Sequence, residues 1–284
     1  MNSNPTLNVI RTTLVQLYYL VRAQISLQNT GRNLLLFFET TGGIAKLLLE
    51  GIYNLPRPPY RGRLLIAQAA VVGWSSIPLV AVTLGFLGMI TVLELKFQLS
   101  RLIHNVSLVP GISALLFFRE FGPCVVAAMV AAKVGAGFTA EIGGMKATDQ
   151  IDALELLGVS PVHYLLVPRL AACVTMQVAL SIVGVFAAFM SGFLVSIFTS
   201  NFQLYLGIVN DFVGWPDFIN LLMKSLALGW VVPVTSCFYG FRARGGAQGV
   251  GEAATKAVVT SILLIIVIDF TISAIADKLV SAVM

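Results

Sequence analysis

Five long apolar runs restrict the fold of this chain more than any other feature. Each is close to or above the roughly 20 residues with which an α-helix crosses a bilayer. Only 11% of the 284 residues are charged and 57% are hydrophobic, whereas soluble domains are about 25% charged. We therefore expect an all-α integral membrane protein with five transmembrane helices. The runs are Leu64–Leu93, Val106–Ala132, Leu170–Thr199, about Phe218–Phe241 and Ala257–Ile275.

The third run has two readings. No charged residue occurs from Leu170 through Asn210, and this length has room for a tight hairpin of two spans. The polar residues from Thr199 to Gln203 favour a single span that ends there, followed by a surface or re-entrant segment.

The N-terminal region differs from these runs. From Thr6 to Tyr53 apolar residues recur at helical spacing, but charges interrupt them too often for a spanning helix. The three prolines in Leu55–Tyr60 end any helix. We predict a cytoplasmic or interfacial helical region over residues 1–63 and a transmembrane domain over 64–284. A retained amphipathic segment is preferred here to a transit peptide. The interrupting charges are Arg11, Arg22, Arg32, Glu39, Lys46 and Glu50.

Basic residues predict the orientation, because Lys and Arg accumulate in short cytoplasmic loops. With five spans and a cytoplasmic N-terminus, the segments placed outside hold only Lys96, Arg101 and Lys278. Most other basic residues then fall in cytoplasmic segments, so we expect an external C-terminus. A six-span arrangement would put both termini inside.

Charged residues within the spans mark candidate functional positions. Arg119 and Glu120 lie roughly 20 Å from the outer end of the second run, where an unpaired charge costs several kcal/mol. Neighbouring side chains on a helix point about 100° apart, so each needs its own partner. A role in lining a substrate cavity is favoured over anchoring between helices. Lys224 and Asp269 lie at similar depths and are predicted to form a buried ion pair, with a proton relay as the alternative.

The polar segment Ala140–Pro161 predicts a short cytoplasmic helix between spans two and three. Thr148 is the expected N-cap, and Gly158 and Pro161 are stop signals. Acidic residues disfavour contact with anionic headgroups, so a partner protein is the preferred contact of the apolar stripe. The stripe consists of Ile151, Leu154 and Leu157.

Other chemistry has little support. The glycine-rich Arg242–Gly251 lacks the lysine and hydroxyl of a phosphate-binding loop. His104 and His163 stand apart, the three cysteines have no metal-ligand spacing, and the basic residues lie beside apolar spans, which argues against nucleic-acid binding. If ATP powers this protein, another subunit binds it.

Four motifs resemble the MlaE/YrbE family of ABC-transporter permeases, which serve lipid transport systems with mammalian-cell-entry (MCE) domains. The similarity begins near Leu64. The motifs are FREFGP at Phe118–Pro123, AEIGGMKATDQIDALELLGVSP at Ala140–Pro161, VPR at Val167–Arg169 and RGGAQGVGEAATKAVV at Arg244–Val259.

The resemblance implies a homodimeric, non-catalytic permease in a bacterial inner membrane, with an interfacial helix at Gly31–Tyr53. Partners would be a cytoplasmic ATPase dimer that binds ATP and Mg, and an MCE-domain hexamer on the outer face. Phospholipids or other hydrophobic molecules would pass between the permease copies. Substrate-binding candidates are Leu116, Phe117, Arg119 and Glu120. Candidates for ATPase contact at the coupling helix are Glu141, Met145, Lys146, Gln150, Asp152, Leu154 and Glu155.

Alternatives stay open at this stage. Lys133 stands where many relatives carry arginine, and plastid-envelope permeases share these motifs. An ion-coupled secondary transporter would use Glu120, Lys224 and Asp269 as protonatable groups. A membrane scaffold would only anchor soluble partners.

Overall fold

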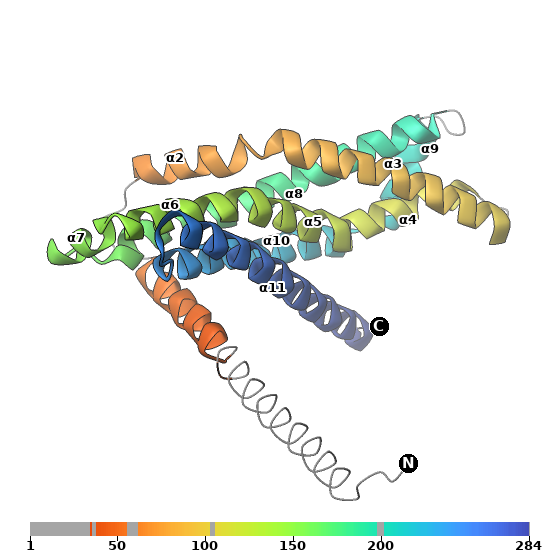
Figure 1. Cartoon of the computed structure of the whole chain (residues 1–284). Helices are drawn as coiled ribbons and strands as arrows, with labels where there is room; N and C mark the ends of the chain where they lie inside the picture. Colours follow the sequence, from red (N-terminus) through yellow and green to blue (C-terminus); the bar gives the residue numbers. More distant parts are fainter. Residues whose placement is uncertain (1–34, 36–37, 56–61, 103–105, 198–201, 284) are drawn as a thin grey trace, which may run out of the picture. The chain divides into compact units, whose positions relative to one another are not determined.

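A computed structural model describes residues 35, 38–55, 62–102, 106–197 and 202–283 of the chain. Every regular element in these ranges is helical (Figure 1). Five helical stretches are long and apolar enough to cross a membrane, which confirms the predicted all-α membrane fold. They are Gly62–Leu102, Val109–Ala147, Val162–Ser196, Trp215–Phe241 and Gly246–Ala276.

Contacts along the chain separate two units, Met1–Lys46 and Leu47–Met284. The described residues 38–54 are helical. Within the second unit, a Cβ atom on Gly51 would lie 3.1 Å from Leu170 and 3.2 Å from Leu166, so Gly51 packs closely against the third span. Most of the predicted surface region, residues 6–34 and 36–37, and the proline block at 56–60 lie outside the described residues.

The first two spans are interrupted helices. The first consists of α2 (Gly62–Gly73) and α3 (Ile77–Leu102), which are joined by a turn at residues 74–76. The second continues through two π-helical turns, in which the backbone bonds from i to i+5. Its parts are α4 (Val109–Leu116), η2 (Phe117–Phe121), α5 (Gly122–Val130), η3 (Ala131–Gly135) and α6 (Ala136–Ala147).

The third span confirms the single-span reading. A π turn, η4 (Val162–Leu166), leads into α8 (Val167–Ser196), which is continuous for 30 residues. The following α9 (Phe202–Phe212) has 11 residues, too few to cross a bilayer. The remaining elements are η1 (Val106–Leu108), α7 (Gln150–Leu156), α10 (Trp215–Phe241) and α11 (Gly246–Val283).

Close helix packing centres on α8, which contacts α2, α3 and α10. A Cβ atom on Gly88 would lie 2.4 Å from the carbonyl oxygen of Ala188, and one on Gly229 would lie 2.8 Å from the Cα of Val174. Glycine therefore allows α3 and α10 to approach the α8 backbone, as small residues do between membrane helices.

The predicted N-cap at Thr148 is wrong. Thr148 ends α6, and its hydroxyl donates to the carbonyl of Gly144 at 3.0 Å. Asp149 occupies the position before α7 with a φ of 56° and makes no side-chain cap. The hydroxyl is used by the preceding helix because α7 follows α6 almost without a connecting loop.

Candidate functional site

The π turn η2 presents the charged pair of span two. The N–H of Gly122 bonds to the carbonyl of Phe117, which closes the wide turn. Pro123 has no N–H, so the carbonyl of Arg119, four residues earlier, lacks its usual α-helical donor. Lys224 of α10 fills this position, because its Nζ donates to the Arg119 carbonyl oxygen at 2.6 Å. A side chain from another span thus completes the backbone bonding of the turn.

Lys224 also joins two acidic residues. It is fully buried, and its Nζ lies 2.8 Å from Glu120 Oε2 and 3.1 Å from Asp269 Oδ1. The contact with Asp269 has the distance of an ion pair but not the alignment of a hydrogen bond. Ser273 of α11 donates to Glu120 Oε1 at 3.0 Å. The structure therefore brings Lys224 and Asp269 together and adds Glu120 to the same group.

Arg119 turns to a different partner. Its Nε donates to Asp217 Oδ1 at 2.6 Å, and Asp217 Oδ2 accepts the backbone N–H of Gly214 at 2.9 Å. The same carboxylate thus caps the start of α10 and holds the guanidinium. The Arg119 side chain stays 46% exposed and that of Glu120 40% exposed. Each presents part of its charged end outside the protein interior.

This charged cluster is defined here as Arg119, Glu120, Asp217, Lys224 and Asp269. Three carboxylates face two cations, so the fully ionised cluster has a formal charge of −1. Paired buried charges of this kind are stable only when each has its partner in place. The exposed guanidinium and carboxylate ends can bind an anionic and a cationic group that lie side by side on one ligand.

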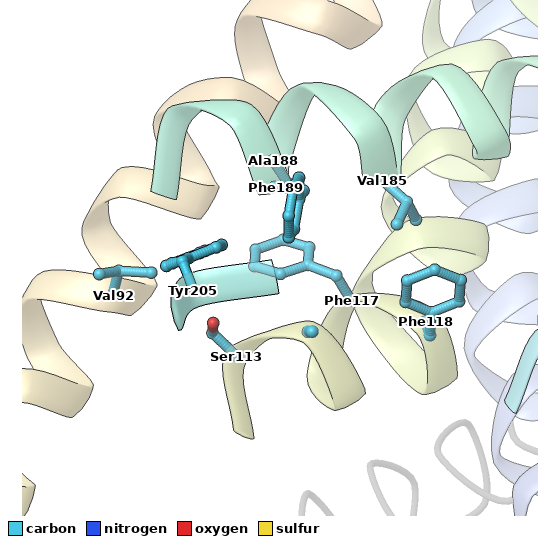
Figure 2. A pocket seen from close by; sticks show the side chains of 9 residues that line it. Val92, Ser113, Phe117, Phe118, Val185, Ala188, Phe189 and Tyr205 are labelled. Atoms are coloured by element: carbon cyan, nitrogen blue, oxygen red, sulfur yellow. The ribbon is translucent and has the colours of Figure 1, made fainter. Parts of the chain in front are cut away.

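An apolar pocket lies on the neighbouring face of the π turn. The aromatic side chains of Phe117, Phe118 and Tyr205 gather around it (Figure 2). Burial raises the pKa of the Tyr205 hydroxyl to about 12, so this wall stays uncharged. Of the predicted substrate residues, Phe117 lines the pocket and Leu116, which is half-buried, does not. The pocket is also lined by Val92, Ser113, Ala114, Val185, Ala188 and Phe189.

The predicted coupling residues lie on α6 and α7. Glu141 Oε2 lies 2.8 Å from Nη2 of Arg169, a buried residue of α8. Lys146 Nζ lies 2.5 Å from Asp152 Oδ1. Glu141, Gln150, Asp152 and Glu155 are exposed, and Met145, Lys146 and Leu154 are half-buried.

The apolar stripe expected on this helix does not stay together. Ile151 is buried, Leu154 is half-buried and Leu157 is exposed. Leu156, which the helical stripe excludes, is 90% exposed. The apolar surface of the loop therefore lies at the end of α7, at Leu156 and Leu157, because the helix ends there and the chain turns.

Sequence reasoning missed three residues that bond within or near these sites. Asp217 follows a glycine by three residues at a helix start, which is the spacing of a carboxylate cap. Ser273 follows Asp269 by four residues and so shares its helix face. Arg169 is one of the basic residues that indicate orientation and ends the VPR motif, but neither feature predicts its ion pair with Glu141. Among the described residues, no group of three or more His, Cys, Asp or Glu side chains could hold a metal ion.

Most of the chain matches a known protein family. Residues 65–275 match the family described as Permease MlaE. A probable ABC transporter permease protein of Rickettsia typhi is 33% identical over 250 residues, which cover 87% of this chain and 96% of the relative. One from Synechocystis sp. is 33% identical over 238 residues, with 83% and 88% covered. One from Porphyra purpurea is 34% identical over 198 residues, with 69% and 75% covered.

Proposed function

Because this chain belongs to the MlaE family of ABC-transporter permeases, we propose that it moves phospholipids or related hydrophobic molecules between the inner membrane and an MCE-protein conduit. A separate ATPase supplies the energy. The observation that carries this proposal is the charged cluster beside an apolar wall, at a depth where charge is costly.

The two faces of the π turn suit an amphiphile. Arg119 is held through Nε by Asp217, so its outer nitrogens remain available to a phosphate. Glu120, one residue away, has a side chain that is 40% exposed, and we expect a headgroup amine to share its carboxylate with Lys224 and Ser273. Phe118, which is half-buried, offers apolar surface to an acyl chain, whereas Phe117 is only 3% exposed and belongs to the core. A phospholipid headgroup and its chains would meet both surfaces at once.

The segment Ala140–Pro161, which holds most of α6 and all of α7 and is called the α6–α7 loop below, is the proposed contact with the ATPase, which binds ATP and Mg. Leu156 and Leu157 present exposed apolar side chains beside acidic residues. The ion pair of Glu141 with the buried Arg169 joins the middle of α6 to α8. Movement of the loop would reach the third span through this contact.

A second copy of the chain and an MCE-domain hexamer complete the proposed assembly. The membrane-crossing part of α10 is 72% buried within one chain, whereas that of α11 is 17% buried. Exposed Leu263, Val267 and Phe270 leave α11 available to a second copy. The proposed location is the bacterial inner membrane, with a cytoplasmic N-terminus and an external C-terminus.

The test is lipid transfer by the chain reconstituted in liposomes with its ATPase. Arg119→Ala should slow ATP-dependent transfer of a fluorescent phospholipid about tenfold, because a charge-assisted hydrogen bond contributes about 1.5–3 kcal/mol. Arg119→Lys should recover part of the rate. Arg101→Ala, which removes an exposed arginine at the end of α3, is the control. Full activity of Arg119→Ala would contradict the proposal.

Ion-coupled transport is the second candidate, favoured by Glu120, Lys224 and Asp269 in direct contact within the spans. It expects a proton gradient alone to drive lipid movement by the purified chain. Transfer that requires ATP and the ATPase would exclude it.

A further inference from the structure

The first span contains a break with exposed polar atoms. α2 ends at Gly73 and α3 begins at Ile77. Trp74, in the connecting turn, is 80% exposed, and Ser75 is exposed beside it. Pro78 has no N–H, so the carbonyl of Trp74 lacks its α-helical donor. The break therefore places polar backbone and an indole ring on the outside of the span.

Lys133 of span two reaches this break. It lies in the π turn η3, is exposed, and donates through Nζ to the carbonyl oxygen of Ser75. A lysine ammonium has three N–H donors, and this contact uses one. None of the ion pairs between described residues involves Lys133. Its positive charge is thus positioned by the break without a carboxylate to neutralise it.

The depth of Lys133 matches a headgroup layer. It follows Val109, the start of span two, by a length of about 36 Å at 1.5 Å per residue. The hydrocarbon core is about 30 Å thick, and headgroups extend the bilayer to about 40–45 Å. Placing Val109 at one edge of the core puts Lys133 just beyond the other edge, on the side of the α6–α7 loop. Tryptophan is enriched at the membrane–water interface. Trp74 precedes Ser75, the residue that Lys133 contacts, and so lies at this level.

We propose that Lys133 and Trp74 form a binding site for the phosphate of an anionic glycerophospholipid in this leaflet, which is cytoplasmic in the orientation proposed above. The two remaining ammonium donors and the indole N–H would bind phosphate oxygens. The acyl chains would lie along exposed Leu79 and Val82 of α3.

This site is separate from the charged cluster. Arg119 precedes Lys133 on the same span by about 21 Å of helix. The proposal rests on membrane insertion and not on transport, so a failure of the transport hypothesis would leave it standing.

The experiment measures lipid enrichment at Trp74 in the full-length chain. Trp215→Phe and Trp230→Phe leave Trp74 as the one tryptophan, since the chain has three. The protein is placed in phosphatidylcholine nanodiscs with an equal small fraction of brominated phosphatidylglycerol or brominated phosphatidylcholine, which quench nearby indoles. Phosphatidylglycerol should be enriched roughly fivefold at Trp74, the effect of one lysine near a headgroup.

Variants identify the cation responsible. Lys133→Arg should keep the enrichment, Lys133→Met should abolish it, and Lys96→Met, which removes the same charge elsewhere in the chain, should leave it unchanged. Salt at about 1 M should weaken it by screening in the single-tryptophan protein that keeps Lys133, a readout that needs no substitution at Lys133. Equal quenching by both lipids, or unchanged preference in Lys133→Met, would overturn the proposal.

Discussion

At the scale of single residues, Lys224 connects three parts of the charged cluster. It completes the backbone of the π turn at Arg119 and pairs with both Glu120 and Asp269. Loss of its charge would leave Asp269 buried without a cation, and a broken buried pair costs more than a pair that is removed whole.

Lys224→Met should therefore lower the free energy of unfolding by about 3–5 kcal/mol. Lys224→Met combined with Asp269→Leu should be less destabilised, because no buried carboxylate is then left unpaired. Thermal unfolding of the purified variants in detergent measures both. If the double variant melts below the single one, Asp269 is stabilised by something other than Lys224.

The charges within spans could be recognised from sequence alone, since charge in an apolar run needs a partner. Their partners were harder to identify. Asp217 and Ser273 bond to Arg119 and Glu120 from other helices, and helical periodicity describes one helix at a time. Thr148 shows a second reason for error. A threonine hydroxyl between two helices can bond to the preceding helix as readily as it caps the following one, and the sequence does not say which.

At the scale of elements, the apolar runs located all five spans, because hydrocarbon thickness sets a minimum length. They did not locate where helices end. α6 continues to Ala147 and α11 begins at Gly246, since helices extend beyond the membrane into polar sequence. The π turns at η2 and η3 leave no mark in hydropathy, because they alter hydrogen bonding and not composition.

The approach of α3 to α8 yields a prediction. Gly88→Ala should destabilise the protein by about 1–3 kcal/mol, because the added Cβ would lie 2.4 Å from a backbone oxygen. Gly137→Ala is the matched control, since its Cβ would meet nothing within 4 Å. Chemical denaturation in detergent should show a loss for the first substitution only. Equal stability of the two variants would mean that α3 can move away from α8 at little cost.

A further prediction concerns the α6–α7 loop. Leu156→Asp with Leu157→Asp should prevent co-purification of the ATPase, because two exposed apolar side chains become charged beside existing acidic residues. Thermal unfolding should change little, since neither side chain is buried. Leu204→Asp, an exposed position on α9, should retain the ATPase. Normal recovery with the double variant would place the contact elsewhere.

At the scale of the whole molecule, burial is distributed unevenly among the spans. α10 is enclosed by its neighbours, whereas much of α11 is exposed within one chain. The sequence separates these two spans by mean hydropathy, 1.5 for α10 and 2.5 for α11, but it does not say whether lipid or a protein partner covers α11, because both favour apolar side chains. The four motifs between Phe118 and Val259 predicted the family that the comparison then matched.

The assembly leads to a prediction for the purified chain. In mild detergent its protein mass should correspond to two copies, and it should hydrolyse no ATP without a partner. Light scattering and a phosphate-release assay measure these properties. Phe270→Asp on exposed α11 should shift the mass towards one copy, whereas Ile90→Asp on exposed α3 is the control. A single copy in every mild detergent would contradict the dimer.

The charged cluster has one more acidic residue than basic residues, and this excess charge makes its energy depend on the membrane voltage. A formal charge of −1 between the two faces of a membrane experiences the transmembrane voltage, worth about 2.3 kcal/mol per charge for every 100 mV crossed. Any step that displaces the cluster towards one face therefore performs electrical work. If transport includes such a step, liposomes held at opposite potentials should differ in transport rate, even for a lipid that carries no net charge.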